Sequence, residues 1–294
     1  MFASRLHHIF NRSSIAKVLE IARYSCGFVQ SDRLNLRQIR AQILPSYFLP
    51  NPKLGRQIVV WGKSDNIRVT DVLNPLDMRE PGLTDIEDLR FPVAMSKLDY
   101  YIGDWSLTGI AIHEIRFNKS PEYGSDFYSG SQPPPHEDKP DSCCKNTEYA
   151  AAINGIFSGW DISFYWTDYY NDMPNTQLIS AVPPPQTEWK HARLKMFGAA
   201  FNQALGNWLL KAETVYIDGF EFFNRPGKEY SRIDVLAGIE YSGFKDTTVS
   251  IEAVKLLANF TSDGRIEVDP PHFTSLHCLS PQMCLRPTQG LRIP

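Results

Sequence analysis

The sequence has no long apolar run, little charge imbalance and no regular cysteine pattern, and each absence excludes a class of protein. No window approaches 18 consecutive apolar residues, so a transmembrane helix is excluded. A formal net charge of −3 gives no electrostatic bias toward nucleic acid. Neither the five cysteines nor the seven histidines have the spacing of a metal site. No nucleophile elbow or glycine-rich nucleotide loop is present, so we expect no metal, no cofactor and no enzymatic activity.

Four predicted hairpins between residues 98 and 257 are the strongest feature that is present. Apolar and polar residues alternate within their arms, which is the period of a β-strand. The tight turns contain two to four residues, whereas the connections 116–146, 170–190 and 220–229 are longer. Short turns gathered at one end are typical of outer-membrane β-barrels. The paired arms are Leu98–Ile102 with Trp105–Ile115, Thr147–Phe157 with Trp160–Tyr169, His191–Leu205 with Trp208–Gly219, and Tyr230–Ser242 with Thr247–Leu257.

Aromatic residues border every one of the tight turns. If all four turns lie at one rim, these residues form a single girdle at a membrane interface. The members of this predicted girdle are Tyr100, Tyr101, Trp105, Phe157, Trp160, Trp208, Tyr241 and Phe244.

Charged residues alternate with apolar ones in the later strands, which indicates a wall with one wet and one apolar face. In a barrel such charges line the lumen, where they either select solutes or pair across neighbouring strands. The sequence favours pairing, because charges of both signs occur in near balance and no ring of a single sign emerges. The predicted lumen-lining residues are Arg193, Lys195, Lys211, Glu213, Arg232, Asp234, Glu240 and Glu252.

The regions outside the hairpins have a different character. Residues 1–50 form a separate segment with a short helix near Ser14–Arg23, and residues 258–294 form an irregular tail. Between them lie a further predicted strand, Leu54–Lys63, and a long loop, Ser64–Pro92. Single-chain bacterial barrels have even strand numbers. Nine predicted strands and the absence of a signal peptide therefore indicate an incomplete segment of a larger barrel.

Several stretches resemble a proteobacterial outer-membrane family known as domain of unknown function 1302. The resemblance covers about residues 52–257 and is carried by Leu54–Asp77, Gly155–Asp172, His191–Gly219 and Tyr230–Val254. It implies an outer-membrane barrel that passes or exports hydrophobic compounds. Members of the family are longer and begin with a signal peptide. The resemblance supplies no activity and no catalytic residues.

The sequence therefore predicts an all-β, antiparallel, up-and-down barrel segment in the bacterial outer membrane. It would act as a channel or export component that contacts membrane lipid and an unidentified solute, with no nucleic acid and no assigned protein partner. One alternative is a soluble or periplasmic β-sheet protein that binds a lipid-like ligand, and another is a degraded reading frame without a function. Ile233, Ile239 and Phe164 should be exposed in the barrel and buried in the soluble protein.

Overall fold

The computed structural model describes residues 51–65, 67–80, 88–142, 145–180, 186–222, 225–244, 247–261 and 286–287. The expected helix near Ser14–Arg23, like the rest of the N-terminal segment, lies outside these residues. Every regular element in the described ranges is a β-strand. Those ranges hold no helix with the length and apolar character needed to cross a membrane.

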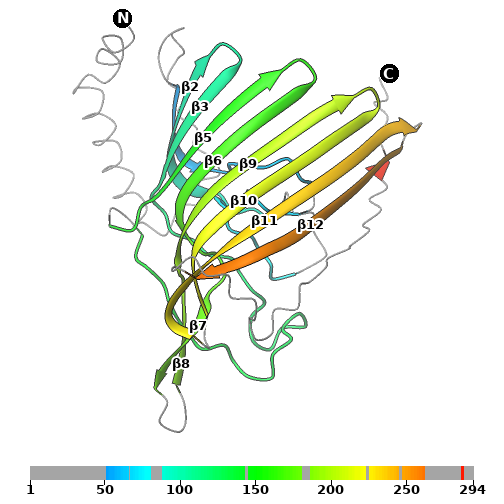
Figure 1. The fold of residues 1–294 in the computed structure, drawn as a ribbon. Coiled ribbons are helices and arrows are strands. Elements are labelled where there is room, and N and C mark those ends of the chain that lie inside the picture. Colours follow the sequence, from blue (N-terminus) through cyan, green and yellow to red (C-terminus); the bar gives the residue numbers. More distant parts are fainter. Residues whose placement is uncertain are drawn as a thin grey trace, which may run out of the picture.

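One ten-stranded sheet, paired in chain order, makes up most of the described structure (Figure 1). All its neighbouring strands are antiparallel, which confirms the predicted all-β antiparallel fold. The strands are β1 (Asn51–Gln57), β2 (Val93–Ile102), β3 (Trp105–Ile112), β5 (Glu148–Phe157), β6 (Trp160–Tyr170), β9 (Arg193–Leu205), β10 (Trp208–Phe222), β11 (Arg225–Phe244), β12 (Thr247–Thr261) and β13 (Arg286–Pro287).

Three of the four predicted tight turns are present at the predicted residues, between β2 and β3, β5 and β6, and β9 and β10. The fourth was predicted at residues 243–246, but β11 continues to Phe244, which pairs with Thr247 of β12. Figure 1 shows the three turns at the same end of the sheet. Gly103, Gly159 and Gly206 occupy these turns with φ of 56°, 84° and 61°. A positive φ is the conformation that a two-residue hairpin turn requires and that glycine adopts without strain. We call this edge of the sheet the turn end and the opposite edge the loop end.

Several predicted boundaries are wrong. β12 continues to Thr261, so residues 258–261 of the expected irregular tail belong to the sheet. Two other differences are larger. The predicted connection 220–229 largely continues the β10–β11 ladder, in which Phe220 pairs with Tyr230 and Glu221 with Glu229. The predicted strand 54–63 ends early, because β1 stops at Gln57. Beyond Gln57, the side-chain amide of Asn74 forms hydrogen bonds with backbone groups that a neighbouring strand would otherwise bind. It accepts from the Val59 N–H at 2.8 Å and donates to the Gln57 carbonyl at 3.1 Å.

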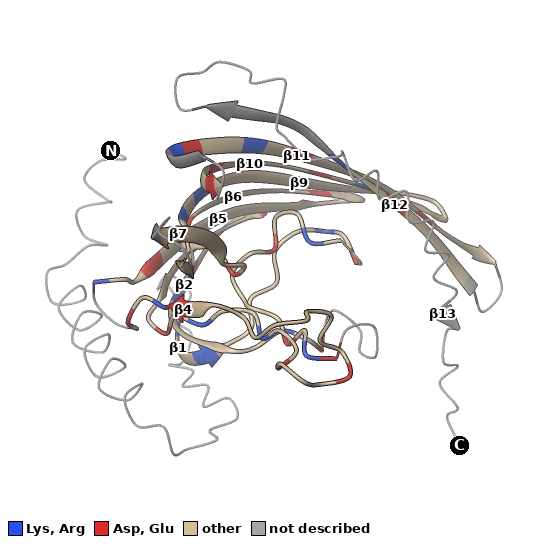
Figure 2. Cartoon of the chain, turned by 90° about the horizontal axis from the view of Figure 1, so that it is seen from below, with Lys and Arg blue, Asp and Glu red and all other residues tan. Residues whose placement is uncertain are grey.

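The sheet is strongly curved, so it has a convex and a concave face (Figure 2). Of the three residues expected to be exposed in a barrel, Phe164 and Ile239 are 45% and 39% exposed on the convex face, whereas Ile233 is half-buried. On the concave face, by contrast, Met196 and Leu236 are completely buried. Within the described part of the chain, the core therefore lies on the concave side only.

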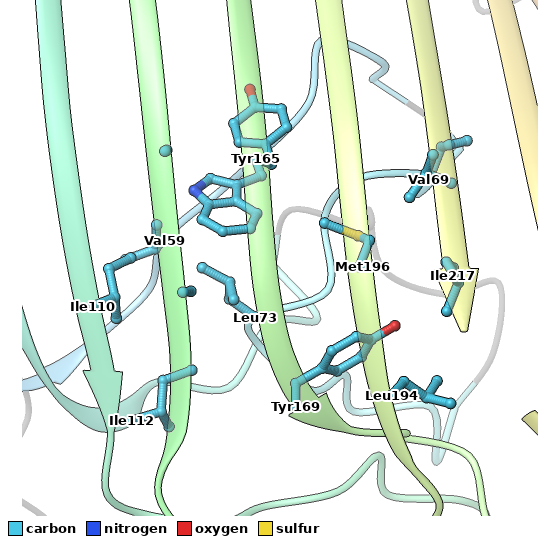
Figure 3. Close-up of a cluster of buried hydrophobic side chains, with 14 of the residues drawn as sticks. Val59, Val69, Leu73, Ile110, Ile112, Tyr165, Tyr169, Leu194, Met196 and Ile217 are labelled. Atoms are coloured by element: carbon cyan, nitrogen blue, oxygen red, sulfur yellow. The ribbon is translucent and has the colours of Figure 1, made fainter. Parts of the chain in front are cut away.

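The core forms where the connection between β1 and β2 folds back onto the concave face. We call residues 58–76, without residue 66, the inner segment. It contributes Val59, Trp61, Val69 and Leu73, all buried. Figure 3 shows Val59, Val69 and Leu73 beside concave side chains of the sheet. The strands supply Val93, Met95, Ile110, Ile112, Ala150, Ala152, Tyr165, Tyr169, Leu194, Met196, Ala200, Val215, Ile217 and Leu236 to this cluster.

A second sheet of three strands lies at the loop end: β4 (His136–Asp138), β7 (Asn175–Ser180) and β8 (Gln186–Lys190). His191, which follows β8, ties it to the main sheet. Its Nε2 lies 2.8 Å from Glu137 Oε1 and its Nδ1 lies 2.6 Å from the carbonyl of Asn171. Although burial tends to raise the pKa of Glu137, hydrogen bonds from His191 and Lys139 outweigh it, so the pKa is lowered.

Candidate functional site

The concave face carries a row of polar side chains across neighbouring strands. Register places Asn202 of β9 opposite both Asp161 of β6 and Lys211 of β10. Gly238 of β11 is in turn opposite Lys211 and Glu252 of β12. The antiparallel pairing of five strands thus gathers residues that are up to 91 positions apart in the sequence into one line.

Six of the eight predicted lumen-lining residues belong to the concave face, and two do not. Arg193 and Lys195 alternate along β9 with Leu194 and Met196, which are buried in the core. Both basic residues therefore point to the convex side, and their predicted shared face with Lys211 is wrong. The six that lie on the concave face are Lys211, Glu213, Arg232, Asp234, Glu240 and Glu252.

The two misplaced residues belong to a charged group at the loop end of the convex face. Lys195 stands opposite Asp168 of β6 and Asp218 of β10 in the register. Arg193 pairs with Asp168, at 2.6 Å between Nε and Oδ1, and its guanidinium lies 5.2 Å from the ring of Tyr170. Charged and aromatic side chains are therefore concentrated at this level of the convex face.

The side chain of Glu213 contacts the inner segment and does not face open space on the concave side of the sheet. Its carboxylate accepts hydrogen bonds from the backbone N–H groups of Lys63 at 2.5 Å and Ser64 at 2.8 Å. The Thr70 hydroxyl donates to its second oxygen at 2.8 Å. Only 3% of Glu213 is exposed. Charge-assisted hydrogen bonds to a buried carboxylate are among the stronger polar contacts, so Glu213 fixes the position of the segment.

Glu252 and Lys211 hold the next turn of the inner segment. The Ser64 hydroxyl donates to Glu252 Oε2 at 2.8 Å, and the Asp65 N–H donates to Oε1 at 3.1 Å. Lys211 Nζ bonds Asp65 Oδ2 at 2.6 Å and also lies 3.2 Å from Glu240. The expected pairing across neighbouring strands is present between Lys211 and Glu240. The sequence did not indicate the contacts of Lys211 and Glu252 with the distant inner segment.

Trp61 and Gly62 pack directly against β6 of the sheet. The indole of Trp61 stacks on Tyr165 of β6 with ring centroids 4.7 Å apart, and Tyr165 also accepts from the Gly62 N–H at 3.3 Å. Gly62 has a φ of 85°, and a Cβ there would meet Thr70 and Glu213 at 2.7–2.9 Å. Only glycine fits, because a side chain would strain the backbone and collide with the Glu213 carboxylate.

The inner segment also has a polar framework of its own. Asp71 Oδ2 binds Arg68 at 3.1 Å and Arg90 at 2.9 Å, and Arg68 donates to the carbonyl of Asn74 at 2.8 Å. Residues 58–76 lie outside the named strands, so these contacts supply hydrogen bonds that buried backbone and charged groups need.

The predicted aromatic girdle lies along the turn end, largely on the convex face. Trp105 contacts Phe157 at 5.5 Å and Phe157 stacks on Trp160 at 4.2 Å. A second row joins Trp208 to Tyr241 and Tyr241 to Phe244, at 4.4 and 5.0 Å. The side chain of Tyr100 lies on the convex face of β2. Tyr101 is the next residue in the strand, so its side chain lies on the concave face.

The inner segment was not predicted from the sequence, in which Ser64–Pro92 was expected to be a plain loop. Residues 58–76 nevertheless carry an unusual density of apolar and polar-capping residues for a surface loop. That density is the signal that could have identified it. In the ranges that the structure covers, no three His, Cys, Asp or Glu side chains come together as metal ligands do.

Comparison with known families gives one match. Residues 50–263 of the 294 match the family described as "Protein of unknown function (DUF1302)". The match covers more than half of the chain and confirms the resemblance expected for residues 52–257. A comparison with curated proteins found no match.

Proposed function

The chain belongs to the DUF1302 family, and we propose that it forms the wall of an outer-membrane β-barrel that acts as a channel or export component. In this proposal the convex face contacts lipid and the concave face lines the path of an unidentified solute. No enzymatic step is proposed.

The observation that carries the proposal is an apolar band on the convex face. Along β6 the convex positions run from Trp160 through Ile162, Phe164 and Trp166 to Asp168. At about 3.3 Å per residue this stretch is roughly 26 Å long, and a strand tilt of about 40° leaves roughly 20 Å of height. That height approaches the apolar band of about 25 Å in outer-membrane barrels.

The two edges of the band support the same arrangement. Trp105, Trp160 and Trp208 are exposed near the tight turns. Arg193 and Lys195 occupy the opposite edge. Tryptophan and tyrosine are favoured at membrane interfaces, and long basic side chains reach from there to water.

The alternative of a soluble sheet requires a second layer over the apolar face. In the described residues Phe164, Ile239 and the equally exposed Ile153, Phe197 and Ile251 have no such cover. An apolar surface of this extent on a soluble protein would promote aggregation or partner binding. The convex exposure therefore favours lipid contact.

The proposal is tested by directing the chain to the outer membrane behind a bacterial signal peptide. We expect it in the outer-membrane fraction, with a gel mobility that changes on heating, and we expect proteoliposomes containing it to pass small solutes. A chain that remains in the soluble fraction with one fixed mobility would contradict the proposal.

A further inference from the structure

We propose that the inner segment is a fixed constriction, which narrows the path along the concave face and sets the largest solute that passes. This inference rests on the proposed function, because only a channel has a path to narrow. Glu213 and Glu252 are then positioning residues for the constriction.

The inner segment reaches across much of the width of the concave face. Lys63 Nζ pairs with Asp161 of β6 at 2.6 Å, while the adjacent Ser64 and Asp65 bind Glu213 of β10 and Glu252 of β12. Residues 63–65 thus contact β6, β10 and β12. In the sheet, β9 lies between β6 and β10, and β11 lies between β10 and β12. Figure 2 shows described loops lying within the arc of the sheet. A chain in that position occupies space that an open barrel would leave to water.

The anchoring is too extensive for a segment that opens in each transport cycle. Trp61 is 6% exposed, and Val69 and Leu73 are equally buried in the core. Moving the segment away would expose this apolar surface and break the bonds to Glu213 and Glu252 at the same time. The C-terminal part of the inner segment is also held in place, because Asn74 Nδ2 donates to the carbonyls of Gln57 and Phe91. A displaced state would therefore be very rarely populated.

The contacts also specify what the two carboxylates do. Glu213 and Glu252 point at backbone N–H and hydroxyl groups of the inner segment, so their charges are already satisfied by protein donors. Their replacement should change the size of the largest solute rather than the preference for positive or negative solutes. A ring of solute-selecting charges would give the opposite result.

An engineered disulfide separates a fixed constriction from a movable gate. A Cβ at Gly198 of β9 would lie 3.1 Å from Thr70 Cγ2, so the pair Thr70→Cys and Gly198→Cys should cross-link on oxidation. Uptake of poly(ethylene glycol) of graded size into proteoliposomes is then compared between oxidised and reduced protein, with both single variants as controls. We expect the same flux and the same size limit. Loss of flux on oxidation would show a gate, and failure to cross-link would show that the segment does not lie on β9.

The double variant Glu213→Ala, Glu252→Ala tests the constriction itself. We expect a larger size limit, unchanged charge preference, and faster maleimide labelling of a cysteine placed at the buried Val69. Glu240→Ala is the matched control, because Glu240 lies on the same face and contacts Lys211. Faster labelling with an unchanged size limit would overturn the constriction and leave the proposed channel intact. No flux in any variant, with the cross-link still forming, would overturn the channel and with it any role for the segment in flux.

Discussion

Replacing Glu213 with alanine should weaken the attachment of the inner segment more than any other change of a single polar group on the concave face. Four donors lose their acceptor: the N–H groups of Lys63, Ser64 and Thr70, and the hydroxyl of Thr70. Each buried donor left without a partner costs about 1–3 kcal/mol. Water entering the site and the removal of a buried charge offset part of this sum. We therefore expect the free energy of unfolding to fall by about 2–4 kcal/mol.

The matched variants make this prediction specific. Glu213→Gln keeps one acceptor oxygen and should lose about half as much stability. Glu240→Ala removes a carboxylate that faces Lys211 at 3.2 Å, and it should cost less than about 1 kcal/mol. The free energy of unfolding is measured by urea titration of the protein in lipid vesicles. A loss in Glu213→Ala no greater than that in Glu240→Ala would refute the anchoring role of Glu213.

Three further changes test other parts of the structure. Trp61→Ala removes the stack on Tyr165 and should destabilise the chain by about 3–5 kcal/mol in the same titration, whereas Trp61→Phe should retain much of that stability. Phe164→Arg should cost about 2–4 kcal/mol in a bilayer, because the side chain would face lipid; a loss near zero would count against lipid contact. Because the pKa of Glu137 is lowered below its usual 4.5, its contribution to stability is present above that pH and is lost as the pH falls through the lower value. Limited proteolysis near β4 should therefore increase on acidification, and Glu137→Gln should reduce this pH dependence.

The hairpins could be predicted because their signals are local. Glycine at Gly103, Gly159 and Gly206 fits the positive φ of a tight turn, and flanking residues alternate with period two. Alternation assigns neighbours to opposite faces but does not say which face is concave. The charges of Arg193 and Lys195 suggested the wet side, whereas in the structure they lie at the loop end of the convex face. Which residues of β9 face the concave side is decided by its register with β6 and β10. Alternation within β9 alone does not reveal that register.

The inner segment could not be derived in the same way because its contacts are distant in sequence. Thr70 binds Glu213, which is 143 residues away, and Ser64 binds Glu252, which is 188 residues away. Nothing in the local sequence at 58–76 identifies these partners. An acidic residue on a strand looks the same whether it will face solute, a neighbouring lysine or a backbone N–H of another segment. Only the curvature of the sheet brings the carboxylates and the segment together.

The central claim is that the convex face contacts lipid while the concave face meets water and the inner segment. Spin labels at Phe164 and Ile153 on the convex face, and at Asn154 on the concave face, test it directly in lipid bilayers. The account predicts that the convex labels collide readily with oxygen and little with a water-soluble nickel chelate, and that the label at residue 154 does not show this lipid pattern. Convex labels that collide freely with the nickel chelate would contradict it.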